Sequence, residues 1–101
     1  MKVCNLSSGS DGNITYIETQ SAKILIDIGL SCTEVKNRLR FIGVEPEEIT
    51  AILITHEHSD HIKGLGVVAR KYHIPVFATF KTLANMNGIG EFDDSLKNAI
   101  S

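Results

Sequence analysis

The sequence has little of several features that mark specialised classes of protein. Its two cysteines, Cys4 and Cys32, are too few for a disulfide framework, and they fit a reducing compartment. No apolar run reaches about 18 residues, so we expect no transmembrane helix and no membrane partner. Residues 1–6 lead directly into polar turn formers, which is not the pattern of a signal peptide. These absences predict a cytoplasmic protein.

Charge of neither sign dominates, because 10 Lys and Arg residues stand against 12 Asp and Glu residues and the formal net charge is -2. The net charge therefore lacks the positive excess that is typical of a dedicated nucleic-acid-binding module. A nuclease is not excluded, since its metal ions can hold the phosphate. Lys63, Arg70 and Lys71 fall on a predicted helix that could meet a phosphate backbone, although a solvated helix face explains them equally well.

The hydrophobic pattern predicts a single small domain. Hydrophobic residues make up 43% of the 101-residue chain, which suits a modest core. The order of expected elements is a strand over 2–6, a strand over 14–19, a strand over 23–28, a helix from the N-cap Ser31 to the stop at Gly43, a strand over 51–54, a helix over 62–72, a strand over 75–78, a helix over 81–87, a break over 88–90 and a frayed helix over 93–100. This order predicts a mixed sheet with helices packed on one side.

The densest chemical signal directly follows the strand predicted over 51–54. Three of the four histidines lie within six residues there, with an aspartate among them, as His56, His58, Asp60 and His61. Side chains two positions apart on an extended backbone leave on the same side, so His56 and His58 should point together. Imidazole and carboxylate groups are the usual ligands of zinc and related metals. Four donors exceed the needs of one tetrahedral site with an open position, so the cluster indicates a metal site, with a binuclear centre as one option.

A less specific interpretation of the cluster is a solvated polar turn. We prefer the metal site, because acidic and imidazole side chains crowded at a strand end destabilise one another unless a cation or solvent neutralises them. The fourth histidine, His73, has no partner at ligand spacing, and we interpret it as a partly exposed residue at a helix end. Cys32 has no visible paired base, so we interpret both cysteines as structural.

Several separated segments resemble motifs of one known family. Residues 55–61, Thr-His-Glu-His-Ser-Asp-His, resemble the signature motif of the metallo-β-lactamase fold superfamily. Residues 25–29, Leu-Ile-Asp-Ile-Gly, resemble its first motif, in which an aspartate ends a strand. Residues 8–13, 62–65 and 74–78 are similar more particularly to the YycJ/WalJ (VicX) branch. The resemblance spans nearly the whole chain, and its motifs come in the family's order.

The resemblance implies an α/β fold, namely the N-terminal half of an αββα sandwich. Residues 1–101 would form a partial domain, because the family takes further metal ligands and a second half from later in the chain. We therefore expect an apolar sheet face that the absent C-terminal half normally covers, and self-association through that face. We also expect the chain alone to be inactive or nearly so.

The resemblance also implies roles for individual residues. His56 and His58 would bind a first metal ion, and Asp60 and His61 a second, with Asp60 as the candidate catalytic residue. Asp27 would steady the ligand loops, and a strand-end turn residue is the less favoured interpretation of it. The implied cofactor is a divalent metal, namely two Zn ions in the full-length protein, with Mn or Fe as alternatives. A loop on the rim of the site would be shaped by Gly9, Gly12 and Asn13.

Three functions follow from these expectations. The first is the N-terminal part of a YycJ/WalJ-like DNA phosphodiesterase or exonuclease that uses a metal-activated hydroxide, since two metal ions can hold the attacking and leaving oxygens of a phosphodiester. The second keeps the fold and replaces the substrate by a thioester, lactam, lactone or small phosphodiester. The third is a non-catalytic metal-binding or interaction module. The partner of the full-length protein would be DNA or another phosphodiester substrate.

Overall fold

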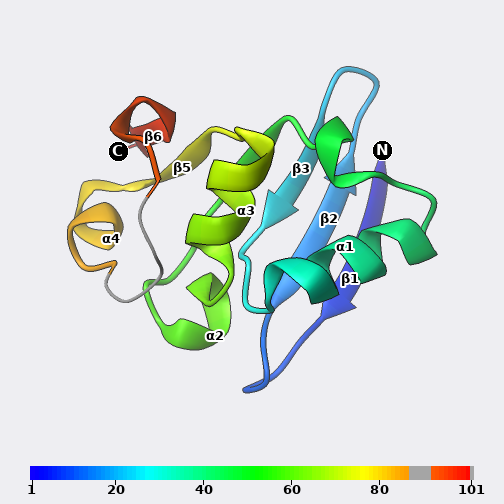
Figure 1. Cartoon of the computed structure of the whole chain (residues 1–101), viewed down its shortest axis with the longest axis horizontal. Coiled ribbons are helices and arrows are strands. Elements are labelled where there is room, and N and C mark those ends of the chain that lie inside the picture. Colours follow the sequence, from blue (N-terminus) through cyan, green and yellow to red (C-terminus); the bar gives the residue numbers. More distant parts are fainter. Residues whose placement is uncertain (87–91, 101) are drawn as a thin grey trace.

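A six-stranded mixed sheet organises the part of the chain that the structure describes, and its strands lie in sequence order (Figure 1). The computed structural model describes residues 1–86 and 92–100. The strands are β1 (Lys2–Ser7), β2 (Ile14–Glu18), β3 (Lys23–Ile26), β4 (Ala51–Leu53), β5 (Val76–Thr79) and β6 (Lys97–Ile100). The pairs β1–β2 and β2–β3 are antiparallel, whereas β3 to β6 pair in parallel. The predicted α/β fold with a mixed sheet is thereby confirmed.

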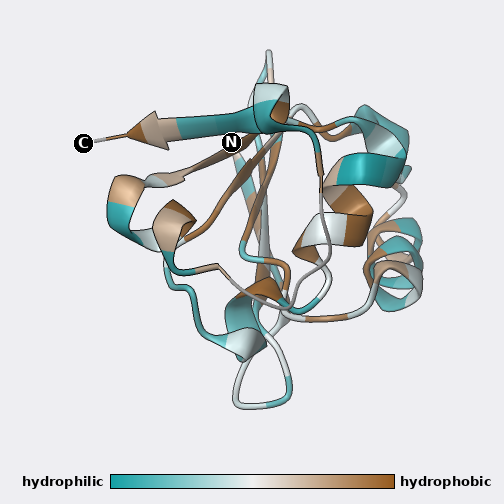
Figure 2. Ribbon diagram, turned by 60° about the vertical axis from the view of Figure 1, so that its left-hand side comes forward, coloured by the Kyte–Doolittle hydropathy of each residue, from teal (hydrophilic) through white to brown (hydrophobic). Residues whose placement is uncertain are grey.

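Helices connect the parallel strands, because parallel pairing requires a crossover. They are α1 (Cys32–Phe41), α2 (Ser59–Ile62), α3 (Leu65–Tyr72) and α4 (Phe80–Ala84), with two 3-10 turns, η1 (Pro46–Glu48) and η2 (Asp94–Leu96). The helices α1 and α3 contact each other in front of the sheet in Figure 1, and Figure 2 shows them together on one side of largely hydrophobic strands. Helix α4 contacts β5 and β6 at one end of the sheet. The expected N-cap of α1 is present, since the Ser31 hydroxyl accepts a hydrogen bond from the Glu34 amide at 3.3 Å.

The core lies between the sheet and these two helices. One row of fully buried side chains crosses four neighbouring strands and consists of Tyr16, Leu25, Ile52 and Val76. Four helical side chains, each at most 1% exposed, bury their apolar groups in the same core, namely Val35, Leu39, Leu65 and Val68. Burying a side chain of this kind contributes about 1.5–3 kcal/mol. The core therefore fixes where each strand ends, and with it the loops that follow.

The other face of the sheet is apolar and only partly covered. Its side chains pair across the strands, Ile17 with Ile24, Ile26 with Leu53, and Leu53 with Phe77. Each of these residues keeps part of its surface exposed. The apolar face expected from the sequence is therefore present. Its cover by a further half of the protein, and self-association through it, stay predictions.

One predicted helix begins late and another is wrong. The helix predicted over 62–72 is present as α3, which begins three residues later, at Leu65, and ends at Tyr72 as predicted. The chain turns between α2 and α3 at Gly64, where a Cβ would lie 2.0 Å from the Leu30 carbonyl oxygen. The helix predicted over 93–100 is instead the turn η2 followed by β6. There the Asp93 carboxylate caps the turn by accepting the Ser95 amide at 2.9 Å, and pairing with β5 satisfies the backbone. Tertiary pairing overrides a weak helical pattern here.

Smaller predictions have mixed outcomes. Helix α4 begins one residue before the predicted range 81–87 and ends at Ala84, and the break predicted over 88–90 lies outside the described residues. His73 is the exposed C-cap of α3, with a left-handed φ of 54°. Both cysteines are free thiols packed against the core. In the described ranges, no helix is long and apolar enough to cross a membrane.

Candidate metal centre

The site lies where the parallel strands β3 and β4 end. Strand β3 ends at Ile26, two residues earlier than predicted, because Asp27 turns into the left-handed region with φ 66°. Its amide still donates to the Leu53 carbonyl at 2.7 Å, which ties the end of β3 to the end of β4. Residues 55–61 follow β4 and lead into α2, whose N-cap is His58. The carboxyl ends of neighbouring parallel strands thus bring Asp27 and the histidine cluster to one edge of the sheet.

The structure brings the four predicted ligands together. The ring centroids of His56 and His61 lie 4.8 Å apart, and those of His56 and His58 lie 5.9 Å apart in a stacked arrangement. The Nε2 atom of His61 lies 3.6 Å from Oδ2 of Asp60. Over residues 1–86 and 92–100, no three or more His, Cys, Asp or Glu side chains are arranged so that they could hold a metal ion as they stand. The assignment of these residues to two metal ions therefore stays a prediction.

Asp27 connects the cluster to the end of β3. Its side chain is only 7% exposed, and Oδ1 accepts the Thr55 amide at 2.8 Å. Its Oδ2 accepts the Thr55 hydroxyl at 2.6 Å and lies 2.7 Å from Nδ1 of His61. Aspartate is among the few residues that tolerate a left-handed backbone, so this position suits both its backbone and its carboxylate. These contacts support the predicted role of Asp27 in steadying the ligand loops.

The same contacts indicate which imidazole nitrogens carry protons. Because a carboxylate only accepts, Nδ1 of His61 donates to Asp27, and in the neutral imidazole the lone pair is then on Nε2. The Thr55 hydroxyl donates to Asp27, so its oxygen can accept from Nδ1 of His56 at 3.0 Å. In the neutral ring of His56, that arrangement places the lone pair on Nε2 as well. A histidine that ligates a metal through one nitrogen characteristically donates the other N–H to a neighbouring oxygen, so the chemistry of His56 and His61 suits metal ligands.

Three chain segments are joined here by backbone hydrogen bonds. The Asn13 amide donates to the Asp60 carbonyl at 2.8 Å, and the Gly29 amide donates to the Asn13 carbonyl at 3.0 Å. The Ile28 amide donates to the His61 carbonyl at 2.7 Å. A Cβ on Gly29 would lie 2.0 Å from the Asp60 carbonyl oxygen and 2.3 Å from the Asn13 nitrogen, so only glycine fits this crossing. The loop around Asn13, predicted to line the rim, in fact contacts a predicted ligand directly.

Sequence reasoning assigned no role to Thr55 and missed the contact between Asn13 and Asp60. Thr55 stands immediately before the first histidine, and a hydroxyl at that place is a signal for a group that fixes the following imidazole. Asn13 follows a turn rich in glycine, and nothing in the sequence relates it to a residue 47 positions later. The three basic residues predicted as possible phosphate contacts are all exposed, namely Lys63, Arg70 and Lys71. Their role stays a prediction.

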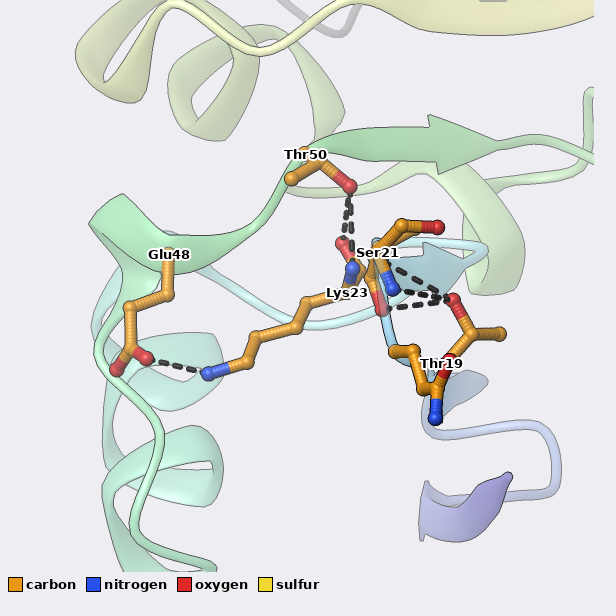
Figure 3. A pocket seen from close by; sticks show the side chains of 7 residues that line it. Thr19, Ser21, Lys23, Glu48 and Thr50 are labelled. Atoms are coloured by element: carbon orange, nitrogen blue, oxygen red, sulfur yellow. Dashed lines mark hydrogen bonds and ion pairs between the residues drawn. The ribbon is translucent and has the colours of Figure 1, made fainter.

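A shallow hollow of about 280 Å³ lies at the opposite ends of β3 and β4 (Figure 3). Lys23 donates to Glu48 across it at 2.5 Å, and the Thr50 hydroxyl bonds the backbone of Lys23. The hydrogen bond between Lys23 and Glu48 lowers the pKa of Glu48 and raises the pKa of Lys23. Opposite charges are already paired, and none of the lining residues is a histidine, cysteine or aspartate. The residues around the hollow therefore close a turn and do not form part of the metal centre.

The fold and the site define a class of protein, and comparison with known families agrees. Residues 8–97 match the model of the metallo-beta-lactamase superfamily, and the chain belongs to that superfamily. Proteins of this superfamily bind divalent metal ions, usually zinc, which bears out the coarser part of the predicted cofactor. The number and identity of the metal ions stay predictions.

Curated relatives narrow the class. The chain is 48% identical over 96 residues to the exodeoxyribonuclease WalJ of Streptococcus pneumoniae, an alignment that covers 92% of this chain and 36% of that protein. It is 49% identical over 77 residues to the exodeoxyribonuclease YycJ of Bacillus anthracis, covering 76% and 29% respectively. The predicted resemblance to the YycJ/WalJ branch is thereby confirmed. The chain spans about a third of the length of these relatives.

Solved structures share the fold. A beta-lactamase from Chitinophaga pinensis is 28% identical with a TM-score of 0.66, covering 73% of this chain and 29% of that one. The metallo-beta-lactamase SMB-1 has a TM-score of 0.74 at 17% identity, covering 91% and 41%. At that identity the second comparison concerns the fold alone.

Proposed function

We propose that this chain is the N-terminal part of a metal-dependent exonuclease that hydrolyses DNA phosphodiester bonds. The observation that carries the proposal is the network in which Asp27 and Thr55 orient His61 and His56. Histidines that ligate metals are usually oriented by such hydrogen bonds, which supports a cation as the ligand of this turn. The nuclease names of the two relatives support DNA as the substrate in preference to a thioester or lactam.

The residues of the chain would divide the work as follows. His56 and His58 hold one divalent cation, Asp60 and His61 hold a second, and Asp27 keeps the His61 ring in place. When bound, the cations would supply Lewis acidity, which lowers the pKa of a coordinated water, and positive charge, which neutralises charge on the phosphodiester. Asp60, with its side chain 32% exposed, is the candidate catalytic residue because it is the one acidic side chain among these four proposed ligands. The 101-residue chain alone is expected to be inactive.

A chimera tests the proposal. The chain replaces the matching N-terminal segment of the Streptococcus pneumoniae WalJ protein, and the cleavage of end-labelled linear DNA is measured with zinc or manganese present. We expect the chimera to degrade DNA from its ends, and His58→Ala in this chain to abolish the activity. A folded, metal-loaded chimera that cleaves thioesters or small phosphodiesters and leaves DNA intact would contradict the proposed substrate. Metal binding by the chain, without turnover in the chimera on any of these substrates, would favour the non-catalytic module.

A further inference from the structure

The side chain of Asn13 holds the carboxylate of Asp60. Its Nδ2 lies 3.2 Å from Oδ2 of Asp60 and 3.1 Å from the carbonyl oxygen of the same residue. Its backbone amide donates to that carbonyl at 2.8 Å as well. Asn13 therefore forms hydrogen bonds to Asp60 with both its main chain and its side chain, although the two residues are 47 positions apart in the sequence.

The amide of Asn13 is the single hydrogen-bond donor that reaches this carboxylate among residues 1–86 and 92–100. The nearest imidazole nitrogen, Nε2 of His61, is 3.6 Å away, which is beyond a hydrogen bond. The Asp60 side chain is also 32% exposed, so packing alone does not fix its rotamer. Its orientation thus depends on one neutral contact.

A neutral donor suits a carboxylate that has to bind a cation. One N–H of the Asn13 amide goes to the Gly9 carbonyl, and the other is shared between the carbonyl and Oδ2 of Asp60. This neutral contact leaves Oδ1 and the full negative charge of the carboxylate available. A lysine or arginine in the same place would pair with the charge and compete with the metal. We propose that Asn13 is a positioning residue that orients the Asp60 carboxylate for a divalent cation. This inference rests on the proposed function, in which Asp60 is a metal ligand.

A purely local role for Asn13 makes a different prediction. Its Nδ2 also donates to the Gly9 carbonyl at 2.9 Å, and its Oδ1 accepts the Gly9 amide at 3.2 Å. These bonds close the turn before β2, so removing the side chain weakens the turn too. Ser7→Ala provides a matched control, because the Ser7 hydroxyl donates to the Gly12 carbonyl at 2.9 Å in the same turn and does not contact Asp60.

The test is a double-mutant cycle on zinc affinity, measured by calorimetry with the chain itself. The variants are Asn13→Ala, Asp60→Ala, the double variant and Ser7→Ala, each checked for folding by circular dichroism and urea unfolding. We expect Asn13→Ala to weaken zinc binding by about 10- to 100-fold, as is usual when a partner of a metal ligand is lost. In the Asp60→Ala background the same change should have no further effect. Ser7→Ala should bind zinc like the unaltered chain.

Each outcome decides one question. If Asn13→Ala binds zinc as well as the unaltered chain while Asp60→Ala does not, the inference is wrong and the proposed ligand stands. If Asn13→Ala weakens binding equally in both backgrounds, Asn13 only shapes the turn. If Asp60→Ala has no effect, or the unaltered chain binds no zinc, the ligand assignment itself fails. Should Asn13→Ala not fold, Asn13→Ser takes its place, because a serine hydroxyl can still close a turn of this kind and is too short to reach Asp60.

Discussion

Charged side chains are arranged in opposite ways at the two ends of β3 and β4. At the end where these strands begin, Lys23 and Glu48 form an ion pair across a closed turn. At the end where they finish, Asp27, Asp60 and the histidines meet, and no lysine or arginine takes part in the described contacts of those acids. The first end neutralises its charge from within the chain. The second end keeps negative charge and imidazole lone pairs, which an external cation can neutralise. One sheet therefore carries a structural end and, at the proposed metal site, a binding end.

The largest expected effect is on the free energy of unfolding, and it comes from filling the space around Gly29 at the binding end. Gly29→Ala places a Cβ against the backbone of Asp60 and Asn13, and it should lower the free energy of unfolding by about 3 kcal/mol in urea unfolding. Gly43→Ala is the control, because its φ of 81° is strained for alanine while no atom lies within 4 Å of the new Cβ. That control should cost about 1–2 kcal/mol. Equal losses for the two variants would mean that the close crossing at Gly29 carries no special strain.

The next effect concerns metal binding without loss of the fold. Asn tolerates the left-handed backbone of Asp27, so Asp27→Asn should remain folded. Its one amide oxygen can still accept the Thr55 amide, which turns its NH2 group toward His61. His61 must then accept at Nδ1 and carry its proton on Nε2, which removes the lone pair that binds metal.

We expect zinc affinity to fall by about 10- to 100-fold in Asp27→Asn. The histidine tautomer can be observed directly by nitrogen NMR of the ring in the metal-free chain. Asp93→Asn is the matched control, since Asp93 caps η2 far along the chain and its replacement keeps an oxygen for the Ser95 amide. A drop in affinity without a change of tautomer would disprove the explanation.

A smaller effect, on self-association, is expected at the partly covered face of the sheet. If the partly covered face mediates self-association, Leu53→Lys should shift the chain toward monomer in sedimentation experiments, because a lysine cannot be buried there unpaired. Val67→Lys on α3 is the control, since that side chain is 39% exposed and lies on a helix away from this face. A chain that is already monomeric at high concentration would remove the basis for this prediction.

The smallest effect is expected at the structural end. The pKa of Glu48 is lowered from 4.5 because Lys23 donates to the carboxylate and, second, because the Glu45 amide does. The folded state therefore binds this proton more weakly than the unfolded chain. The stabilising contribution is complete above about pH 4.5 and is lost as the pH falls through the lowered pKa.

Glu48→Gln should accordingly make the urea midpoint less dependent on pH between about pH 5 and pH 3. Its zinc affinity at neutral pH should match that of the unaltered chain, because the pair lies at the other end of the strands. A loss of zinc binding in this variant would mean that the two ends are coupled.

Local chemistry made part of this molecule predictable. The strand starts at Lys2, Ile14, Lys23 and Ala51 agree with the sequence because turn formers and apolar runs bound them, and the N-cap at Ser31 is a local signal. The clustering of the histidines follows from their spacing. Residues 93–100 were misread because β6 forms only by pairing with β5, a partner that no local pattern names.

The site was predictable to a similar depth. Asp27 was placed correctly as a strand-end residue, but the identity of its partners, Thr55 and His61, depends on how β3 and β4 align. The contact of Asn13 with Asp60 depends on the close approach of both residues to the backbone of Gly29. Such contacts are set by packing across long separations in the chain, and one sequence holds no direct record of them.

The backbone bonds that join the three loops also bear on the motions of the chain. Loops usually exchange their amide hydrogens fast, because they open at little cost. The amides of Asn13 and Ile28 donate to carbonyls of α2, the amide of Gly29 donates to the Asn13 carbonyl, and all three lie next to a buried core. They should therefore exchange as slowly as the central strands, while the amides of the turn over residues 19–22 exchange early. The binding end would be the rigid part of this small protein, with its side chains mounted on loops that open only when the whole domain unfolds.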